Sequence, residues 1–186
     1  MLCRAMAAFE QRLDRCADIA RWTEKARRLS DRIEAQLWDE SSGHYADRHR
    51  SDGALSDVPS PAIFMPPYAG KTASPERAER MARLAADPER FLPGMPTVSY
   101  NHPAYVADGF WRGPTRLNAA CFALRGMKDY GFDAVADACR DTILVWCAAN
   151  EDAIYERYDS RTRAGCGDPG FSWSAAFVIE FILGWE

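Results

Sequence analysis

The chain has 186 residues, the length of one domain with a sizeable core, and its 47% hydrophobic and 27% charged residues are ordinary for a soluble globular protein. The net charge is -4 and the Lys and Arg residues are scattered, so the sequence has no basic stripe for nucleic acid. The aromatic share of 12% is more informative, because large planar side chains also form stacking platforms in open clefts.

The first segment, up to about Leu37, is helical in pattern, with apolar residues at spacings of three and four. Two stripes are expected, formed by Phe9, Leu13, Cys16 and Ala20 and by Ala26, Leu29, Ile33 and Leu37. Charged residues (Arg4, Glu10 and Arg12) interrupt any apolar run at the start, so no signal peptide is expected. Residues 38–40 end the helix, and the polar stretch SSGHYADRHRSDG predicts a hairpin or a long loop.

The middle of the chain alternates between irregular and helical sequence. Three prolines (Pro59, Pro61 and Pro66) are expected to break any helix in the segment from Val58 to Gly70. Ser74 and Pro75 then predict a helix start, with Ser as the N-cap and Pro at the first helical position, and this helix is expected to run to about Ala86. The next loop, 87–114, is long for a compact domain, and long ordered loops are often functional.

The second half of the chain predicts three more helices. Pro114 is expected to start one that Gly131 ends, with an apolar stripe of Leu117, Ala120, Cys121, Leu124 and Met127. A partner helix follows at once, with Phe132, Val135, Cys139, Ile143, Trp146 and Cys147 on one face, and the tight junction predicts an antiparallel hairpin. After the strand-like AIYERYD, Ser172 is expected to cap a last helix that is apolar nearly all round and therefore buried. Its apolar run is too short to span a bilayer, so no membrane partner is expected.

Cysteine and histidine usage argues against metal chemistry. The six cysteines show no CxxC pair and no zinc-ligand spacing, and three of them lie in apolar helical stretches, which favours reduced structural thiols in a cytoplasmic protein. None of the three histidines has an HxxxH or HExxH partner. A Gly-rich phosphate loop and a GxSxG elbow are also absent. No cofactor or metal is therefore predicted.

Helical hairpins are thus expected to be joined alternately by tight turns and by long, aromatic-rich loops. That alternation predicts a helical toroid, in which the long loops gather at one end and form a cleft. A plain helical bundle needs no such loops.

The segment FWRGPTRLN, residues 110–118, is the first candidate for a binding site. Trp111 offers an apolar ring face to the C–H side of a sugar, and Arg112 offers planar donors to hydroxyls or to a carboxylate. Gly113 lets the chain turn sharply into the next element. The alternative is a Trp wedged under the loop with Arg as its surface neighbour, and the residues alone leave both open.

Glu156, in AIYERYD, is the second candidate. A general base needs an ionised carboxylate that is fixed in orientation and within reach of a water molecule. Strand-like alternation would place Glu156 and Tyr158 on one face, where the phenol could orient the carboxylate. On these residues alone, a solvated surface charge is the more common outcome for a glutamate.

The order of the motifs along the chain resembles that of a known protein family. The segments QLWDESSGHYAD, FMPPYAG, FWRGPTRLN, ALRGMKDYGF, AIYERYDSRTRAG and FSWSAAFVIEFI come in sequence over most of the chain. This series resembles the C-terminal part of the catalytic domain of glycoside hydrolase family 63, which includes processing α-glucosidases and mannosylglycerate and glucosylglycerate hydrolases. The trehalases of family 37 are more distant relatives with the same fold.

The resemblance implies an all-α fold, the (α/α) toroid of six helical hairpins, with residues 1–186 as a single partial domain and short β-hairpins in its long loops. It implies an inverting α-glycosidase that acts on a gluco- or manno-configured glycoside and uses one carboxylic acid and one carboxylate base. Glu156 matches the base of the family's Tyr-Glu-x-Tyr-Asp segment. Phe110, Trp111, Arg112, Gly113, Tyr158 and Trp173 fall in the motifs that line the sugar pocket. Some relatives bind calcium, but no Asp-rich loop predicts a site here.

Three departures from the family pattern qualify these expectations. The family usually has a second aromatic residue where this chain has Arg116, so one wall of the sugar pocket is expected to differ. Ser160-Arg161-Thr162-Arg163 replaces a Pro-x-Thr-Gly turn, so Glu156 is expected to be held less firmly. The family's general acid lies in an upstream aspartate motif that this sequence lacks, so we expect roughly half of the toroid to be missing and its exposed faces to favour self-association or binding of the N-terminal half.

Two other functional readings remain open. A sugar epimerase on a related toroid would use His as acid and base, and the three His residues show no such arrangement. A non-catalytic carbohydrate-binding or scaffold protein descended from such an enzyme is favoured by Arg116 and by the changed turn at 160–163.

Overall fold

The computed structural model describes residues 1–69 and 74–185. The helices are α1 (Leu2–Arg12), α2 (Cys16–Leu37), the 3-10 helix η1 (Pro61–Phe64), α3 (Met65–Tyr68), α4 (Pro75–Ala86), α5 (Leu117–Lys128), α6 (Asp133–Ala149) and α7 (Ser172–Leu183). The strands form two short antiparallel hairpins, β1 (Trp38–Asp39) with β2 (His44–Tyr45) and β3 (Arg157–Tyr158) with β4 (Gly165–Cys166). The expected place of the Cys16 side chain in the first stripe, and the end of the proline-rich segment at Gly70, lie outside the described residues.

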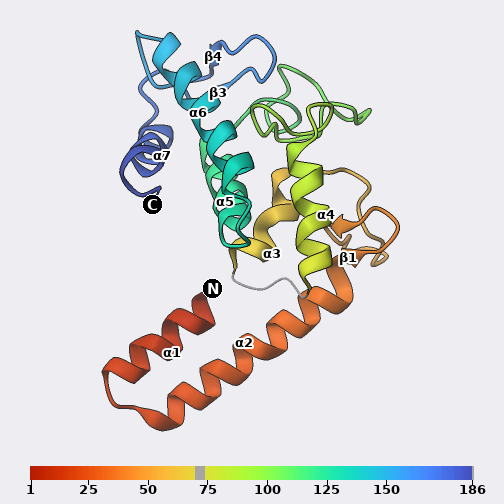
Figure 1. The fold of residues 1–186 in the computed structure, drawn as a ribbon, viewed down its shortest axis with the longest axis vertical. Coiled ribbons are helices and arrows are strands. Elements are labelled where there is room, and N and C mark those ends of the chain that lie inside the picture. Colours follow the sequence, from red (N-terminus) through yellow and green to blue (C-terminus); the bar gives the residue numbers. More distant parts are fainter. Residues whose placement is uncertain (70–73, 186) are drawn as a thin grey trace.

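The α5–α6 hairpin stands at the centre of the molecule (Figure 1) and confirms the predicted pair of antiparallel helices. Gly131 lies in the junction with a φ of 79°, a left-handed conformation that glycine adopts without strain. The predicted apolar stripes face each other. Leu117, Leu124, Ile143 and Trp146 are buried, and Phe132 and Val135 are partly buried. These residues belong to one hydrophobic cluster that also takes in side chains from α4, the following loop and α7.

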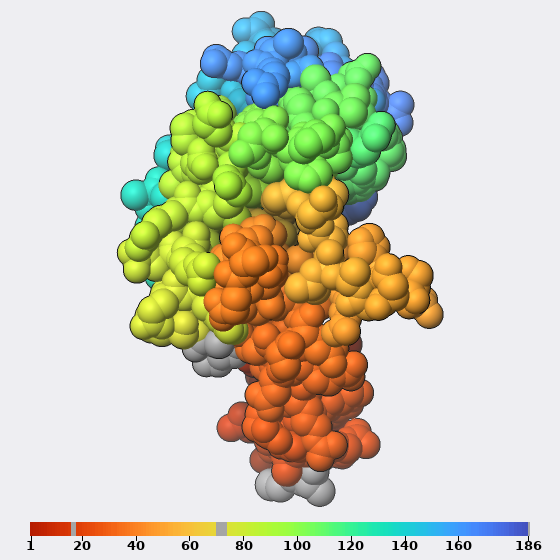
Figure 2. Space-filling model, turned by 90° about the vertical axis from the view of Figure 1, so that its right-hand side faces the viewer, coloured from red at the N-terminus to blue at the C-terminus, as the bar shows by residue number. Residues whose placement is uncertain are grey.

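Helices α1 and α2 form an arm that projects away from the rest of the molecule (Figures 1 and 2). The two helices pack along each other, and the chain reverses between them at Asp14, whose φ is 55°. Much of the expected apolar surface is open in this arm, with Phe9 and Leu13 exposed by 57% and 47%. Arg4 ties the arm to the body through a 2.9 Å hydrogen bond from Nη1 to the carbonyl oxygen of Ala69.

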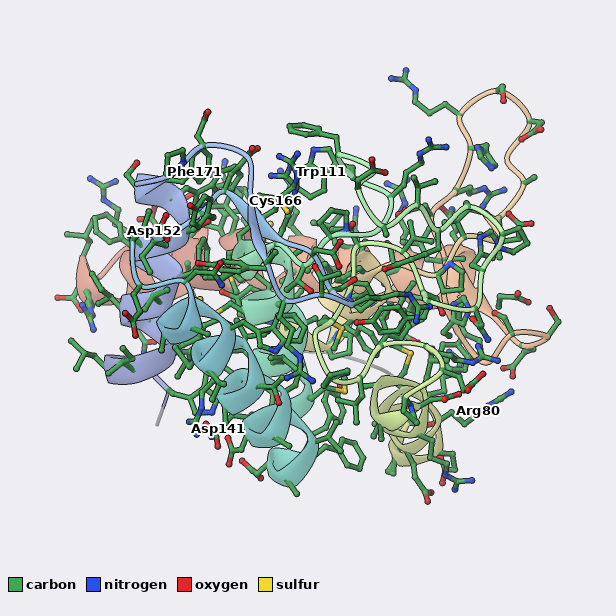
Figure 3. The ribbon with its side chains drawn as sticks, turned by 90° about the horizontal axis from the view of Figure 1, so that it is seen from above. Arg80, Trp111, Asp141, Asp152, Cys166 and Phe171 are labelled. Atoms are coloured by element: carbon green, nitrogen blue, oxygen red, sulfur yellow. The ribbon has the colours of Figure 1, made fainter. Side chains whose placement is uncertain are left out.

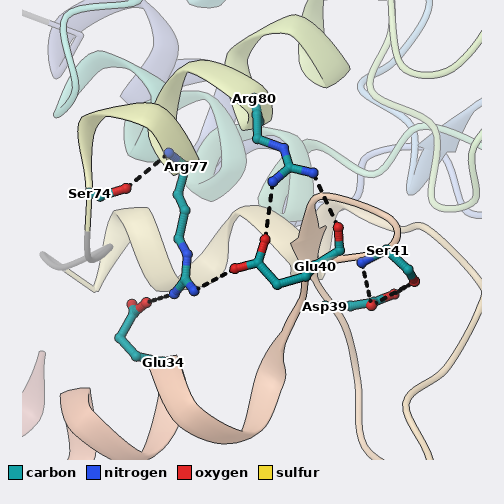
Figure 4. A network of polar contacts seen from close by, with 7 residues as sticks. All are labelled: Glu34, Asp39, Glu40, Ser41, Ser74, Arg77 and Arg80. Atoms are coloured by element: carbon teal, nitrogen blue, oxygen red, sulfur yellow. Dashed lines mark hydrogen bonds and ion pairs between the residues drawn. The ribbon is translucent and has the colours of Figure 1, made fainter.

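A network of ion pairs anchors the far end of α2 to α4 (Figure 4). The guanidinium of Arg77 donates to Glu34 at 2.8 Å and to Glu40 at 2.9 Å, and Arg80 donates to Glu40 at 3.2 Å. Arg77 also lies over the ring of Trp38, 4.4 Å from its centroid. The start of α4 is as predicted, because Ser74 Oγ accepts from the backbone N–H of Arg77 and Pro75 takes the first helical position.

Three predicted features of the helices are wrong. The proline-rich segment contains the short helices η1 and α3, because Pro61 and Pro66 occupy first-turn positions, where a missing N–H costs nothing. Pro114 does not start a helix, because Thr115 forms extended bridges to Pro96 and Tyr158 and α5 begins only at Leu117. Ser172 does not cap α7; it is the first helical residue, Phe171 precedes it at the N-cap position, and no side chain caps that end.

Helix α7 is also less buried than its sequence suggests. Within it only Ser174 and Phe181 are buried, whereas Ile179, Ile182 and Leu183 are exposed by 57%, 61% and 77%. The helix packs on α5 and α6 with one side, and no described element covers its other side. The described part of the chain contains no helix with the length and apolar character needed to cross a bilayer.

Candidate active site

The loop after α4 and the β3–β4 hairpin meet at one end of the α5–α6 pair, and Figure 3 looks onto that end. Thr115 donates its backbone N–H to the carbonyl oxygen of Tyr158 at 2.8 Å and accepts from the N–H of Tyr158 at 3.0 Å. Two tyrosines of the loop reinforce the junction, since the hydroxyl of Tyr100 donates to the carbonyl oxygen of Ser160 and that of Tyr105 lies 3.0 Å from Ser160 Oγ. The two predicted motifs, FWRGPTRLN and AIYERYD, are therefore brought together.

Glu156 lies at this junction with its side chain 12% exposed. Its Oε1 accepts from Nη1 of Arg116 at 3.1 Å, and its Oε2 accepts from Nη1 of Arg157 at 2.7 Å. The backbone is fixed as well, because the N–H of Glu156 donates to the carbonyl oxygen of Asp168 and its carbonyl oxygen accepts from Ser174 Oγ. An ionised carboxylate has acceptor sites for about four hydrogen bonds, so the two arginine contacts do not use all of them.

Phe110 and Trp111 form an exposed aromatic pair beside this carboxylate. Their rings are exposed by 57% and 47% and their centroids lie 6.4 Å apart. Trp111 is therefore a surface ring rather than a wedge under the loop. Arg112 is exposed next to them. Trp173, the last predicted aromatic of the site, is 50% exposed at the start of α7, which is the helix whose Ser174 holds the backbone of Glu156.

Gly113 is buried, and only glycine fits its place. A Cβ there would lie 2.0 Å from the carbonyl oxygen of Val106 and 2.7 Å from its carbonyl carbon. The N–H of Gly113 donates to Thr97 Oγ1 at 3.0 Å, and its carbonyl oxygen accepts from Ser160 Oγ at 3.1 Å. This glycine therefore seats the aromatic loop against the hairpin.

Tyr158 is placed differently from the expectation that it shares an open face with Glu156. Its side chain is fully buried, and its hydroxyl oxygen accepts from the backbone N–H of Tyr155 at 3.2 Å. Burial, together with a hydrogen bond to Cys147, raises the pKa of Tyr158. This residue supports the hairpin from the core side and does not reach a ligand at the surface.

The turn that replaces Pro-x-Thr-Gly is held by side-chain contacts. Asp159 Oδ1 accepts from the N–H groups of Arg161 and Thr162, both at 2.8 Å. Asn150 donates to the carbonyl oxygen of Arg163 at 3.1 Å and accepts from the N–H of Gly165 at 2.8 Å. Arg163 takes a φ of 69°, the conformation that a glycine would have supplied.

Sequence reasoning missed the two arginines that contact Glu156. The sequence identifies Arg116 only as a departure from an aromatic position, and strand-like alternation predicts Arg157 on the face opposite Glu156 and Tyr158. The sequence carries no local signal for the Arg116 contact, because Arg116 lies 40 residues from Glu156 and only the fold brings them together. No group of three or more His, Cys, Asp or Glu side chains suitable for a metal ion occurs in residues 1–69 and 74–185.

Comparison with known proteins shows the family of this chain. Residues 2–174 match the model of the mannosylglycerate hydrolase MGH1-like glycoside hydrolase domain. The chain is 30% identical to the mannosylglycerate hydrolase of Rubrobacter radiotolerans over 164 residues, which cover 86% of this chain and 36% of the relative. It is similar to the crystal structure of the family 63 mannosylglycerate hydrolase of Thermus thermophilus in complex with glucose, with 29% identity and a TM-score of 0.84 over 98% of this chain and 44% of that one.

A more distant similarity concerns the fold alone. The neutral trehalase of Saccharomyces cerevisiae superposes with a TM-score of 0.67 at 20% identity, over 88% of this chain and 30% of the trehalase. These matches confirm the predicted (α/α) toroid class, of which this chain forms a part. The chain spans about a third of the length of the curated relatives that it matches.

Proposed function

Because the chain belongs to the mannosylglycerate hydrolase MGH1-like glycoside hydrolase family, we propose that it carries the general base and one sugar-binding wall of a glycoside hydrolase site. The single observation that supports this most is the position of Glu156. Its carboxylate is fixed from two sides and lies next to exposed aromatic rings at the end of the molecule where the long loops meet.

In the proposed reaction, Glu156 accepts a proton from a water molecule that attacks the anomeric carbon. The leaving oxygen is protonated by a carboxylic acid that another part of the ring supplies, and the configuration is inverted. The two carboxyl groups of an inverting site lie about 6.5–9.5 Å apart, which leaves space for the water. No acid in the present chain is assigned to this role.

Trp111 and Trp173 would form the sugar-binding wall. Their exposed ring faces suit the apolar C–H side of a hexose, while Arg112 has donors for hydroxyl or carboxylate oxygens. The substrate class we propose is a gluco- or manno-configured glycoside, and the relatives' names make mannosylglycerate the first compound to test. Gly113 and Tyr158 would act as supports of this wall rather than as ligand contacts.

The open apolar faces of the arm and of α7 would contact the remainder of the ring or a second copy of the chain. Leu2 and Phe9 on α1 and Ile182 and Leu183 on α7 are the most exposed of these side chains. We treat residues 1–186 as a single partial domain of the toroid. The five cysteines whose side chains the structure describes are free thiols. A reducing, cytoplasmic location stays a proposal.

The test is hydrolysis of mannosylglycerate by the chain alone and by a chimera in which this chain replaces the matching region of the Thermus thermophilus enzyme. The isolated chain should show little turnover. The chimera should release mannose with inverted configuration, and proton NMR of the first product measures that anomeric configuration. Glu156→Gln should reduce turnover of the chimera by about 10²–10⁴-fold. The control is Glu151→Gln, an exposed glutamate beyond the end of α6. Full turnover in the Glu156→Gln chimera would disprove the assignment of the base.

A second candidate is a carbohydrate-binding protein without turnover. The observation that favours it is that arginines occupy both oxygens of Glu156. Calorimetric binding of methyl α-D-mannoside to a chimera that hydrolyses nothing would select this candidate.

A further inference from the structure

Arg116 occupies a junction between the two halves of the candidate site. It lies on the extended segment just before α5, next to Thr115, which exchanges backbone hydrogen bonds with Tyr158. Its side chain therefore leaves the main chain beside the hairpin that carries Glu156. Only 4% of that side chain is exposed.

The guanidinium of Arg116 holds three groups at once. Its Nη1 donates to Glu156 Oε1 at 3.1 Å, while Nε and Nη2 donate to the carbonyl oxygen of Phe110 at 3.2 Å and 3.0 Å. Its Cζ also lies 4.0 Å from the centroid of the Trp111 ring and 4.4 Å from that of the Phe110 ring. The hydrogen bonds use three guanidinium nitrogens at once, and lysine has no such fixed planar set of donors.

Arg157 does not provide the same link. It holds the other oxygen of Glu156 and approaches the ring of Phe110 at 5.2 Å. Arg116 both pairs with the Glu156 carboxylate and lies over the Trp111 ring. An exposed ring such as that of Trp111 needs a contact of this kind to keep one orientation.

We infer that Arg116 is the positioning residue of this site, which fixes the Glu156 carboxylate and the Phe110–Trp111 aromatic pair as one unit. The inference stands on the contacts of this chain. Its consequence for sugar binding rests on the proposed function. The role differs from that of an aromatic pocket wall, because Arg116 binds the carboxylate and the rings without reaching the surface.

The first experiment measures coupling between the carboxylate and the ring, and it needs no substrate. The indole N–H signal of Trp111 is assigned in a proton–nitrogen NMR spectrum with Trp111→Phe. Glu156→Gln should shift this signal in the wild-type background and leave it unmoved in the Arg116→Met background. An equal shift in both backgrounds would overturn the inference.

The control and the conservative variant separate positioning from folding. Arg83→Met removes an exposed arginine that pairs with Glu79 on α4, and it should leave the Trp111 signal unchanged. Arg116→Lys keeps the charge with a single donor group, so it should preserve the melting temperature better than Arg116→Met and still weaken the coupling. If Arg116→Met fails to fold, Arg116→Lys is the test. If Glu156→Gln then shifts the Trp111 signal as much in the Arg116→Lys background as in the wild type, the planar guanidinium is not needed for the coupling.

The second experiment measures binding of methyl α-D-mannoside to the chimera by calorimetry. Arg116→Met and Trp111→Ala should each weaken binding by about tenfold, and Arg83→Met should not. If the wild-type chimera does not bind this probe, the proposed function fails while the NMR coupling still tests the inference. If Arg116→Met binds it as well as the wild type does, Arg116 does not position the site.

Discussion

Thr115 and Tyr158 exchange two backbone hydrogen bonds, at 2.8 Å and 3.0 Å, and this pair joins the loop of the aromatic residues to the hairpin of Glu156. The side chain of Thr115 adds a third contact, because its Oγ1 donates to the carbonyl oxygen of Gly94 at 2.6 Å in a buried place. The junction is therefore part of the core, and its stability can be measured separately from any activity.

Thr115→Val should lower the free energy of unfolding by about 1–3 kcal/mol, because it leaves the buried carbonyl oxygen of Gly94 without its donor at nearly constant side-chain volume. For a chain of this size the melting temperature should fall by about 2–4 °C per kcal/mol. Thr142→Val is the matched control, since Thr142 donates to a backbone carbonyl oxygen on the exposed side of α6, and its effect should stay within about 0.5 kcal/mol. Equal melting temperatures for the two variants would contradict a buried role for Thr115.

Gly113→Ala should disturb the aromatic loop, because the new Cβ would meet the backbone of Val106 at 2.0 Å. We expect a loss of about 1–3 kcal/mol in the free energy of unfolding and a shift of the Trp111 indole NMR signal. Gly131→Ala serves as a comparison, because its Cβ would meet nothing within 4 Å and only the positive φ opposes it. That variant should lose stability without moving the Trp111 signal; a Trp111 signal left unmoved by Gly113→Ala would show that the loop adapts elsewhere.

Asn150→Ala should loosen the turn between β3 and β4, since Asn150 contacts both Arg163 and Gly165. The amide of Gly165 should exchange with solvent about tenfold faster, equivalent to about 1.4 kcal/mol in local opening. Native-state hydrogen exchange by NMR measures this directly. Gln36→Ala, on an exposed position of α2, should leave the Gly165 rate unchanged, and an unchanged rate in Asn150→Ala would mean that Asp159 alone holds the turn.

Stability should fall in alkaline solution because buried acidic groups keep their protons in the folded chain. Burial raises the pKa of Cys121 to about 11, that of Cys139 to about 12 and that of Tyr100 to about 12. These groups have higher pKa values folded than unfolded, so their contribution is complete below the unfolded thiol pKa of about 8.5 and is lost as the pH rises towards 11–12.

Urea denaturation at several pH values checks this expectation. The free energy of unfolding should be flat between about pH 7 and 8.5 and should then decline by up to about 1.4 kcal/mol per pH unit for each group involved. Cys139→Ala removes one of these protons, so its decline should be shallower even where its stability at pH 7 is lower. If the free energy of unfolding stays constant up to pH 11, the two thiols and Tyr100 do not make stability depend on pH.

The local signals in the sequence predicted the helices well. Ser74 and Pro75 mark the start of α4, and the stripes containing Leu124 and Ile143 give the α5–α6 hairpin, because capping and periodicity act over a few residues. Pro114 misled for the opposite reason. Its segment is extended because Thr115 pairs with Pro96 and Tyr158, which are distant in sequence and invisible to a local rule.

The candidate site could be predicted only in part. The side chains of Trp111 and Glu156 indicate ring stacking and acid–base chemistry, and the order of the motifs indicates that the two residues belong to one site. The contact of Arg116 with Glu156 depends on a tertiary junction, so no local pattern indicates it. The exposed face of α7 could not be predicted, because an apolar sequence indicates that a helix packs against something. It does not indicate whether that partner lies in the same chain.

The α1–α2 arm has a consequence for how cooperatively this molecule unfolds. Its helices pack mainly on each other, with Arg4 and the Arg77 network among the polar ties to the body. The contacts around Glu156, in contrast, come from the segments between Gly94 and Ser174. We therefore expect the arm to open as a separate unit at a lower free energy than the core, with the carboxylate and its aromatic neighbours still assembled.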